Sequence, residues 1–128
     1  MIILDENIRD DQEELLLKKR IRVRRVGREF GRLGMDDSEI IPLLHALPKS
    51  TLFTHDVDFY RPRLAHRNYC LVHLNVADRM AANYIRRVLR HAALDTKTKR
   101  MGAVIQVHGT GLAMWRIGEK TEIHLEWA

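Results

Sequence analysis

The sequence predicts one α/β domain, a three-layer α/β/α sandwich with a mostly parallel sheet and a C-terminal antiparallel hairpin. Apolar, strand-like runs alternate with helix-like segments as far as residue 91, an order that is typical of parallel sheets. Two further apolar runs then flank a Gly-rich turn at residues 108–111, which predicts a hairpin. The chain of 128 residues has the length of a single domain. We therefore expect an α/β core over residues 1–91 and a hairpin with further strands over residues 101–127.

The composition is that of a globular protein. Hydrophobic residues make up 45% of the chain and charged residues 30%, which excludes a disordered chain. The single cysteine, Cys70, excludes an intramolecular disulfide and is typical of a reducing cytosol. No apolar run approaches the ~20 residues of a membrane helix, and an acid at position 5 argues against a signal peptide. We expect a cytoplasmic protein that has no membrane partner.

The first part of the chain predicts a buried strand, a helix and an edge strand. Residues 1–4 are all apolar, as in a strand that is covered on both faces. Asn7 is expected to cap the next helix, which places Leu15 and Leu16 on its buried face. Residues 21–26 alternate between apolar and basic, and this pattern predicts a strand near the sheet edge with one solvated face.

The second helix carries a capping signal. Residues 27–34 are rich in glycine and predict a loop. Asp36 and Glu39 then stand at capping-box spacing in front of an apolar segment, and Pro48 helps to end the helix. Residues 52–54 predict the next buried strand.

The third helix follows a further apolar strand at residues 69–76, and Asp78 is expected to cap it. Its polar side carries Arg79, Arg86 and Arg90, which we take as candidate contacts for an RNA backbone. Beyond it the sequence predicts strands at residues 103–107, 112–117 and 121–127.

The basic charge is concentrated in parts of the chain. The net charge is +5, and residues 1–64 contribute none of it because 12 basic residues balance 12 acidic ones. Residues 18–32 carry eight basic residues against one acid, and residues 79–100 carry seven against one. Such stretches attract polyanions, of which nucleic acid is the commonest. The alternative is a set of solvated helix faces whose Lys and Arg side chains suit the helix dipole.

Acidic residues accompany three successive predicted strands. They are Asp5 after the first strand, Asp36, Asp37 and Glu39 at the helix that follows the second, and Asp56 and Asp58 after the third. Because the carboxyl ends of parallel strands meet at one edge of a sheet, we expect these carboxylates at one rim. Two unpaired carboxylates about 4 Å apart repel by roughly 4 kcal/mol, and a hard cation such as Mg²⁺ or Mn²⁺ removes that repulsion. Alternatively, each acid taken alone is a helix cap, a turn residue or an incidental strand end.

Three segments resemble a known family. Residues 1–7 (Met-Ile-Ile-Leu-Asp-Glu-Asn), 37–40 (Asp-Ser-Glu-Ile) and 53–59 (Phe-Thr-His-Asp-Val-Asp-Phe) are similar to the PIN-like domains of an uncharacterised bacterial and archaeal family, which is related to the VapC-type toxins of toxin–antitoxin pairs. The resemblance continues through the hairpin at residues 102–118 and covers most of the chain. The hairpin stands where the toxins have a final parallel strand, which is a departure from their pattern.

The resemblance implies a ribonuclease that uses Mg²⁺ or Mn²⁺ and a water nucleophile on an RNA phosphodiester. By match to the motif, the catalytic and metal-binding acids are Asp5, Asp37, Asp56 and Asp58. Thr54 is expected to support the site, and Glu39 is a substitute for Asp37 because the toxins often carry Glu on the second helix. An antitoxin protein and a second copy of the chain are the candidate protein partners.

Two other classes of function remain open. One is a PIN-like module that binds RNA or regulates without catalysis. The other is a phosphoacceptor receiver domain, which fits poorly because its paired acids follow the first strand, whereas here the close pair Asp56 and Asp58 follows the third. Zinc is disfavoured because none of the seven histidines stands at His-x-x-x-His spacing.

Overall fold

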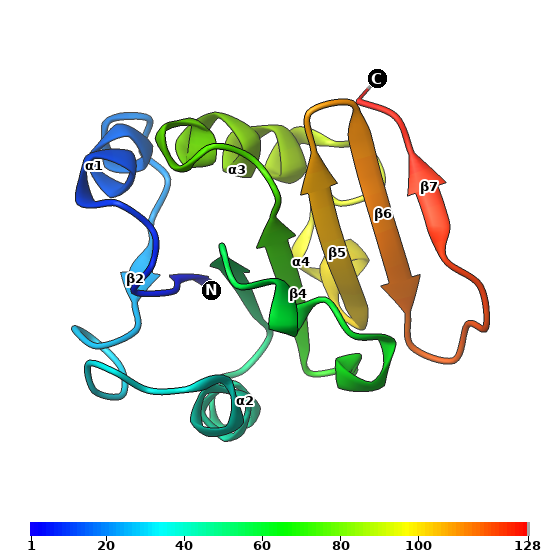
Figure 1. Cartoon of the computed structure of the whole chain (residues 1–128), viewed down its shortest axis with the longest axis horizontal. Coiled ribbons are helices and arrows are strands. Elements are labelled where there is room, and N and C mark those ends of the chain that lie inside the picture. Colours follow the sequence, from blue (N-terminus) through cyan, green and yellow to red (C-terminus); the bar gives the residue numbers. More distant parts are fainter. Residues whose placement is uncertain (128) are drawn as a thin grey trace.

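The chain, described over residues 1–127 by a computed structural model, forms one seven-stranded sheet with the order β2-β1-β3-β4-β5-β6-β7 (Figure 1). The strands are β1 (Ile2–Leu4), β2 (Arg24–Arg25), β3 (Ser50–Thr54), β4 (Tyr69–Leu74), β5 (Ala103–His108), β6 (Gly111–Arg116) and β7 (Ile123–Leu125). Strands β1 to β5 are parallel to one another, whereas β6 is antiparallel to both β5 and β7. The α/β class and the mixed sheet predicted from the sequence are confirmed.

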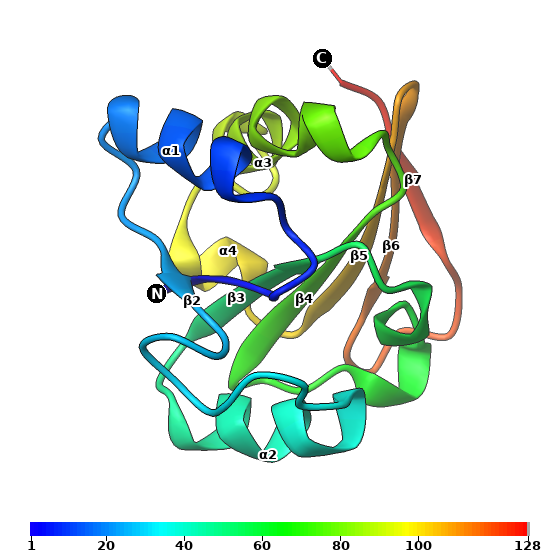
Figure 2. The ribbon, with the colours of Figure 1, turned by 60° about the vertical axis from the view of Figure 1, so that its left-hand side comes forward.

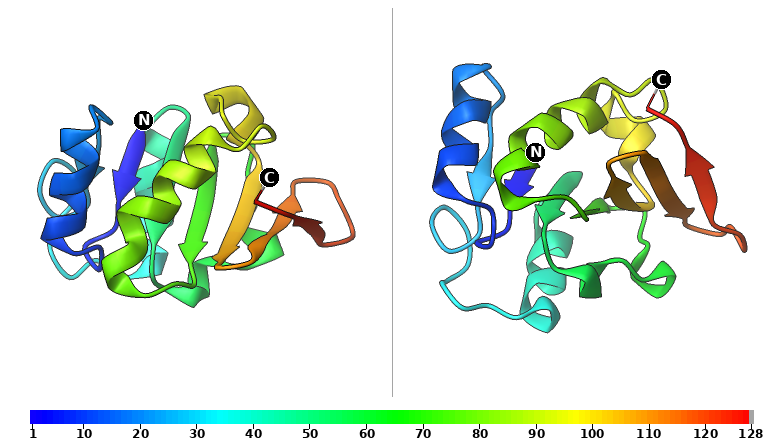
Figure 3. Two further views of the ribbon diagram at one scale, coloured as in Figure 1. Left: turned by 90° about the horizontal axis from the view of Figure 1, so that it is seen from above. Right: turned by 45° about the horizontal axis from the view of Figure 1, so that its top comes forward.

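Helices cover both faces of the sheet. The α-helices are α1 (Asp10–Lys18), α2 (Asp37–Ala46), α3 (Ala81–Arg90) and α4 (Lys97–Arg100), and the 3₁₀ turns are η1 (Val57–Phe59), η2 (Pro62–Leu64) and η3 (Asp78–Met80). Helices α1 and α3 lie on one side of the sheet and α2 lies on the other (Figure 2). Helix α3 runs obliquely across the strands toward the C-terminal end of the chain (Figure 3).

The core has two halves because successive strand residues point to opposite faces. Phe53 and Val72 are paired in register and pack under α1 and α3. Their neighbours Leu52 and Leu71 pack with α2 on the other side. All four side chains are fully buried. This two-sided burial explains why the central strands read as continuous apolar runs.

The first helix differs from its prediction. It begins at Asp10, and no side chain caps it, so the capping role expected for Asn7 is wrong. The Asn7 side chain instead donates to Thr54 Oγ1 at 3.2 Å and accepts from the His55 N–H at 3.1 Å. Leu16 is fully buried, but Leu15 is 47% exposed, because adjacent helical residues are about 100° apart and the core covers only a stripe of a surface helix.

The predicted cap is confirmed for α2 and is wrong for α3. The Asp36 carboxylate accepts from the Glu39 N–H at 3.1 Å, which confirms the predicted cap of α2. Asp78 does not cap α3, because it lies in the 3₁₀ turn that precedes the helix. A residue distant in sequence serves the helix end instead, since the Ala82 N–H donates to Gln12 Oε1 at 2.9 Å.

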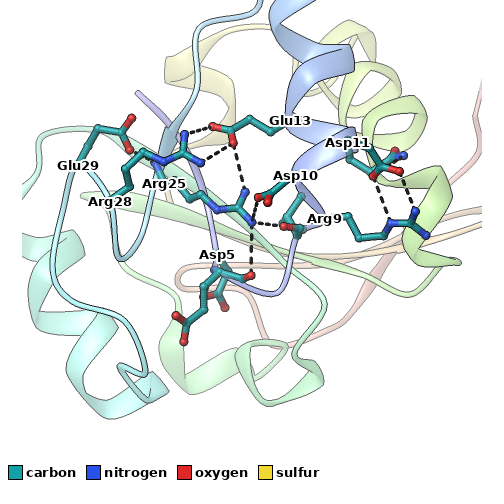
Figure 4. A network of polar contacts seen from close by, with 11 residues as sticks. Asp5, Arg9, Asp10, Asp11, Glu13, Arg25, Arg28 and Glu29 are labelled. Atoms are coloured by element: carbon teal, nitrogen blue, oxygen red, sulfur yellow. Dashed lines mark hydrogen bonds and ion pairs between the residues drawn. The ribbon is translucent and has the colours of Figure 1, made fainter.

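The edge strand β2 is shorter than the alternating run that predicted it, although it does lie at the sheet edge. Its Arg25 side chain is buried to 8% exposure and lies beside Glu13 and Asp10 of α1 (Figure 4). The Arg25 guanidinium also donates to the Ile8 carbonyl. These contacts tie the strand to α1 and hold the segment that follows β1. The predicted hairpin of β5 and β6 is confirmed.

Candidate functional site at the carboxyl edge of the sheet

A row of polar side chains crosses four neighbouring strands at the carboxyl edge of the sheet. Thr54 pairs in register with His73, and His73 pairs with Gln106. Asp5 directly follows β1 and lies beside Thr54 of β3, and its N–H donates to the Phe53 carbonyl at 2.9 Å. Because residues paired in register point to the same face, the four polar side chains lie on the α2 side of the sheet. The row replaces the apolar side chains that fill the rest of this face.

Asp5 is the most buried carboxylate of the edge, at 5% exposure. The Thr54 hydroxyl donates to its Oδ2 at 2.7 Å, and the Glu6 N–H donates to its Oδ1 at 2.8 Å. Burial raises the pKa of Asp5, while these two hydrogen bonds act against the rise. Within residues 1–127, Asp5 has no ion pair with a basic side chain. A buried carboxylate is therefore stabilised here by neutral donors alone.

Asp56 meets Asp5 through the same threonine. The Asp56 N–H donates to Thr54 Oγ1 at 3.0 Å, so the hydroxyl is shared between the two acids. The charge of Asp56 is among the causes that raise the pKa of Asp5. One carboxylate oxygen of Asp56 accepts from the Asp58 N–H at 2.9 Å and caps the turn η1. Asp56 thus serves as a cap and lies beside the buried acid as well.

The remaining predicted acids lie elsewhere at this edge. Asp37 and Asp58 line a second hollow together with side chains of α2 and η2, and Asp58 pairs with Arg61 at 3.2 Å. Glu39 forms an ion pair with Arg32 at the surface. In the part of the chain that the structure describes, no three His, Cys, Asp or Glu side chains lie close enough to hold a metal ion. The single rim expected from the sequence is therefore divided into the pair Asp5–Asp56 and a separate hollow.

The pair Asp5–Asp56 suits a hard cation in donor type. Mg²⁺ is commonly held by one or two carboxylates, with waters and phosphate oxygens as its other ligands. Each oxygen of Asp5 accepts one hydrogen bond and has capacity for a further contact. The missing counter-charge of Asp5 is the observation that fits a cation. The residues present thus fit Mg²⁺ or Mn²⁺ with a ligand set completed by water and substrate.

His73 joins this edge, although the sequence pattern gave it no role in the site. It is 5% exposed, and its Nδ1 lies 3.0 Å from the amide nitrogen of Gln106, which donates to it. Burial, followed by the charge of His55, lowers the pKa of His73. The signal that places His73 beside Thr54 is the register of two strands. Local sequence does not carry that register.

The three arginines of the predicted row lie on the turn η3 and on α3. Arg79 is exposed in the turn η3, ahead of the helix. Arg86 lines a groove with Leu15 and the lysines at the end of α1. Arg90 lines a different hollow, together with Arg87. Arg86 and Arg90 are four residues apart on α3, a spacing that places them on one helical face, and the row as an RNA contact stays a prediction.

Comparisons of the chain with protein-family models, with curated proteins and with solved structures found no match. None of the helices within residues 1–127 is both long and apolar enough to cross a membrane. The PIN-like resemblance stays a prediction, and the geometry of the carboxyl edge carries the functional argument.

Proposed function

We propose that the chain is a PIN-like ribonuclease that depends on Mg²⁺ or Mn²⁺ and hydrolyses RNA phosphodiester bonds. The observation that carries the proposal is the buried Asp5 carboxylate, which has Asp56 beside it and no basic partner within residues 1–127. A carboxylate in such surroundings disfavours its own charge unless a cation is supplied. The resemblance of residues 1–7, 37–40 and 53–59 to PIN-like domains supports the same reading.

Asp5 and Asp56 would hold the cation, and Asp37 and Asp58 would act from the neighbouring hollow. When bound, a divalent metal supplies a Lewis acid that lowers the pKa of a water molecule and offsets charge on the phosphate. The chain's own contribution is to fix the acids, since Thr54 donates to Asp5 and accepts from the Asp56 backbone. Such prior orientation spares reorganisation when a charged substrate binds.

A toxin of a toxin–antitoxin pair, acting in the cytoplasm against cellular RNA, is the narrower form of this proposal. It rests on the resemblance to VapC-type proteins. A small antitoxin-like protein encoded next to this chain would favour it, and a homodimer is the further assembly that it suggests.

A second candidate is an RNA-binding or regulatory module that keeps the fold without turnover. The observation in its favour is that no three potential ligand side chains come together in the described part of the chain. Metal-dependent cleavage of RNA distinguishes the two candidate functions, because only the nuclease predicts it.

The test is cleavage of labelled single-stranded RNA with Mg²⁺ or Mn²⁺, with EDTA as the metal-free reference. The proposal expects cleavage by the wild type and loss of cleavage in Asp56→Asn. Asp95→Asn is the matched control, because Asp95 lies at the surface in an ion pair with Lys99 away from this edge. If Mn²⁺ raises the melting temperature without cleavage, the metal site stands and the substrate is wrong. If neither effect is seen, the binding module replaces the nuclease.

A further inference from the structure

Arg87 lies over two adjacent aromatic rings at the surface of α3, whose centres are 5.7 Å apart. Its guanidinium carbon lies 4.5 Å from the centre of the Trp127 ring and 5.1 Å from that of Tyr84. A cation–π contact of this kind restrains the guanidinium against the ring faces and does not use its N–H groups. No hydrogen bond or ion pair joins Arg87 to another residue in the range 1–127. The side chain is thus restrained, and its N–H donors have no partner among residues 1–127.

The same side chain lines a hollow of about 400 Å³ at the end of α3. The other lining residues are Arg90, His91, Ala92 and Trp127. Arg90 is exposed and, like Arg87, has no acidic partner in the described chain. The lining contains two arginines and no carboxylate side chain, so its electrostatic character is that of an anion site.

The walls of this hollow are fixed by contacts between segments distant in sequence. The Trp127 indole N–H donates to the His108 carbonyl at 2.9 Å. The His91 ring nitrogen Nε2 donates to the Glu126 carbonyl, also at 2.9 Å. These bonds hold the C-terminal segment against the end of α3, where the two lie side by side (Figure 3). The hollow is therefore built by the fold and is not a chance gap between mobile side chains.

The hollow also adjoins the carboxyl edge of the sheet. His108 ends β5, and its ring nitrogen lies 3.3 Å from the Asn75 side-chain amide just beyond β4. His108 follows Gln106 by two residues on β5, and Gln106 belongs to the polar row beside Thr54. A nucleic-acid strand that passes over His108 would run from the hollow toward the pair Asp5–Asp56.

We propose that the hollow lined by Arg87, Arg90 and Trp127 binds the backbone phosphates of single-stranded RNA, with the aromatic rings offering a surface for its bases. The choice of RNA rests on the proposed ribonuclease function. A guanidinium fork matches phosphate oxygens, and aromatic side chains next to basic ones are the usual means of holding single strands without sequence preference. An acidic protein segment would use the arginines but would leave the aromatic surface without a role.

A structural explanation competes with this proposal. Basic residues in the last turn of a helix suit its dipole, and Arg87 also covers part of the Trp127 ring. Both roles are fulfilled without any ligand. They predict that removing Arg87 changes stability and leaves the affinity for RNA as it was.

The experiment measures binding without cleavage. A fluorescent single-stranded oligo(U) with 2′-O-methyl riboses is titrated in EDTA against the wild type, Arg87→Gln and Arg90→Gln. Arg67→Gln is the matched control, because Arg67 is exposed and lies outside the hollow. We expect each hollow variant to bind about tenfold more weakly, and the slope of log affinity against log salt to fall by about 0.7 per lost phosphate contact.

The two tryptophans provide a second readout. RNA should quench wild-type fluorescence, and Trp127→Phe should lose that quenching while Trp115→Phe, altered on β6 outside the hollow, retains it. The melting temperature of each variant shows whether it is folded. The inference is overturned if Arg87→Gln matches Arg67→Gln in affinity and salt slope, or if polyglutamate binds as tightly as RNA. Binding through the hollow without cleavage in Mn²⁺ would leave this inference standing and contradict the nuclease alone.

Discussion

The Thr54 hydroxyl donates a 2.7 Å hydrogen bond to Asp5 across two neighbouring parallel strands, and both side chains are buried. The same oxygen accepts from the Asp56 N–H, so one hydroxyl fixes the positions of two acids. Burial raises the pKa of Asp5, and the Thr54 bond is the first of the contacts that act against the rise. The Thr54 hydrogen bond therefore favours the ionised form of Asp5 against the effect of burial.

The substitution Thr54→Val should destabilise the protein and raise the pKa of Asp5 further. Valine keeps the branched shape of the strand residue but removes the donor to a charged acceptor, at a cost of about 1.5–3 kcal/mol. Urea unfolding at neutral pH measures the loss, and a ¹³C NMR titration of the Asp5 carboxyl group follows its pKa. Thr54→Ser is the control that keeps the hydroxyl. Equal stability of the Val and Ser variants would show that the bond contributes nothing.

The substitution Asp5→Asn should remove a pH-dependent part of the stability. Because the pKa of Asp5 in the folded chain is raised above the ordinary value of 3.8, the native state binds the proton more tightly than the unfolded state. Stability from this group is therefore present at acid pH and is lost as the pH rises through the folded pKa. We expect the stability of Asp5→Asn relative to the wild type to improve from acid to neutral pH.

Urea unfolding over that range measures the trend. Glu14→Gln is the control, because Glu14 is exposed on α1. A pH dependence in Asp5→Asn that matches the wild type would mean that Asp5 is not the group responsible.

Short sequence patterns predicted those parts of the fold that are formed by contacts between residues close in sequence. The Asp36 cap and the hairpin turn are formed by residues within a few positions of one another, and both are confirmed. The helix caps assigned to Asn7 and Asp78 are wrong, because the Asn7 side chain bonds to Thr54 instead, and the Ala82 N–H at the start of α3 donates to Gln12. A capping residue is only a preference, and packing overrides it.

The candidate site follows the same division. Asp5 and Asp56 could be placed together from the ends of neighbouring parallel strands, and they do share Thr54. The position of His73 depends on the register of β4 against β3. The contact between Arg87 and Trp127 joins a residue that precedes the β5–β6 hairpin in the sequence to one that follows it. No period or spacing in the sequence encodes either relation.

The substitution Glu13→Gln should strongly destabilise the protein. Glu13 is 5% exposed, and its carboxylate lies 3.6 Å from the guanidinium of Arg25, which is 8% exposed (Figure 4). The same carboxylate accepts two hydrogen bonds, at 2.8 and 2.9 Å, from the exposed Arg28. The Arg25 Nη1 atom has no hydrogen-bond partner among the described residues, so loss of the facing charge leaves it uncompensated. Asp10 lies 3.3 Å from Arg25 and retains part of the pairing. We expect a loss near 3 kcal/mol, at the lower end of the range for broken buried pairs.

Chemical denaturation measures this loss. Asp11→Asn is the matched control, because Asp11 pairs with Arg9 at 2.7 Å on the surface and exposed pairs contribute less than about 1 kcal/mol. Similar losses in the two variants would mean that burial does not increase the importance of the Glu13 pairing.

The substitution Gly111→Ala should displace β7 from the sheet. A Cβ atom at position 111 would lie 2.5 Å from the Leu125 carbonyl oxygen, a backbone atom that can move only with its strand. Overpacking of this kind costs roughly 1–3 kcal/mol. Because Trp127 follows β7 by two residues, the shift should also disturb its bond to the His108 carbonyl. Urea unfolding measures the stability, and the emission maximum of Trp127 in a Trp115→Phe background reports the displacement.

Gly109→Ala is the control within the same turn, since a Cβ at that position meets only the Tyr84 hydroxyl, at 3.6 Å. Both variants replace glycine by alanine, and they differ in the atoms that the new Cβ contacts, which are backbone atoms only at position 111. If the two variants unfold at the same urea concentration with the same emission maximum, β7 is free to move at no cost, and the wall of the hollow that it carries is not fixed by the fold. A loss confined to Gly111→Ala ties the position of Trp127 to the register of β6 and β7.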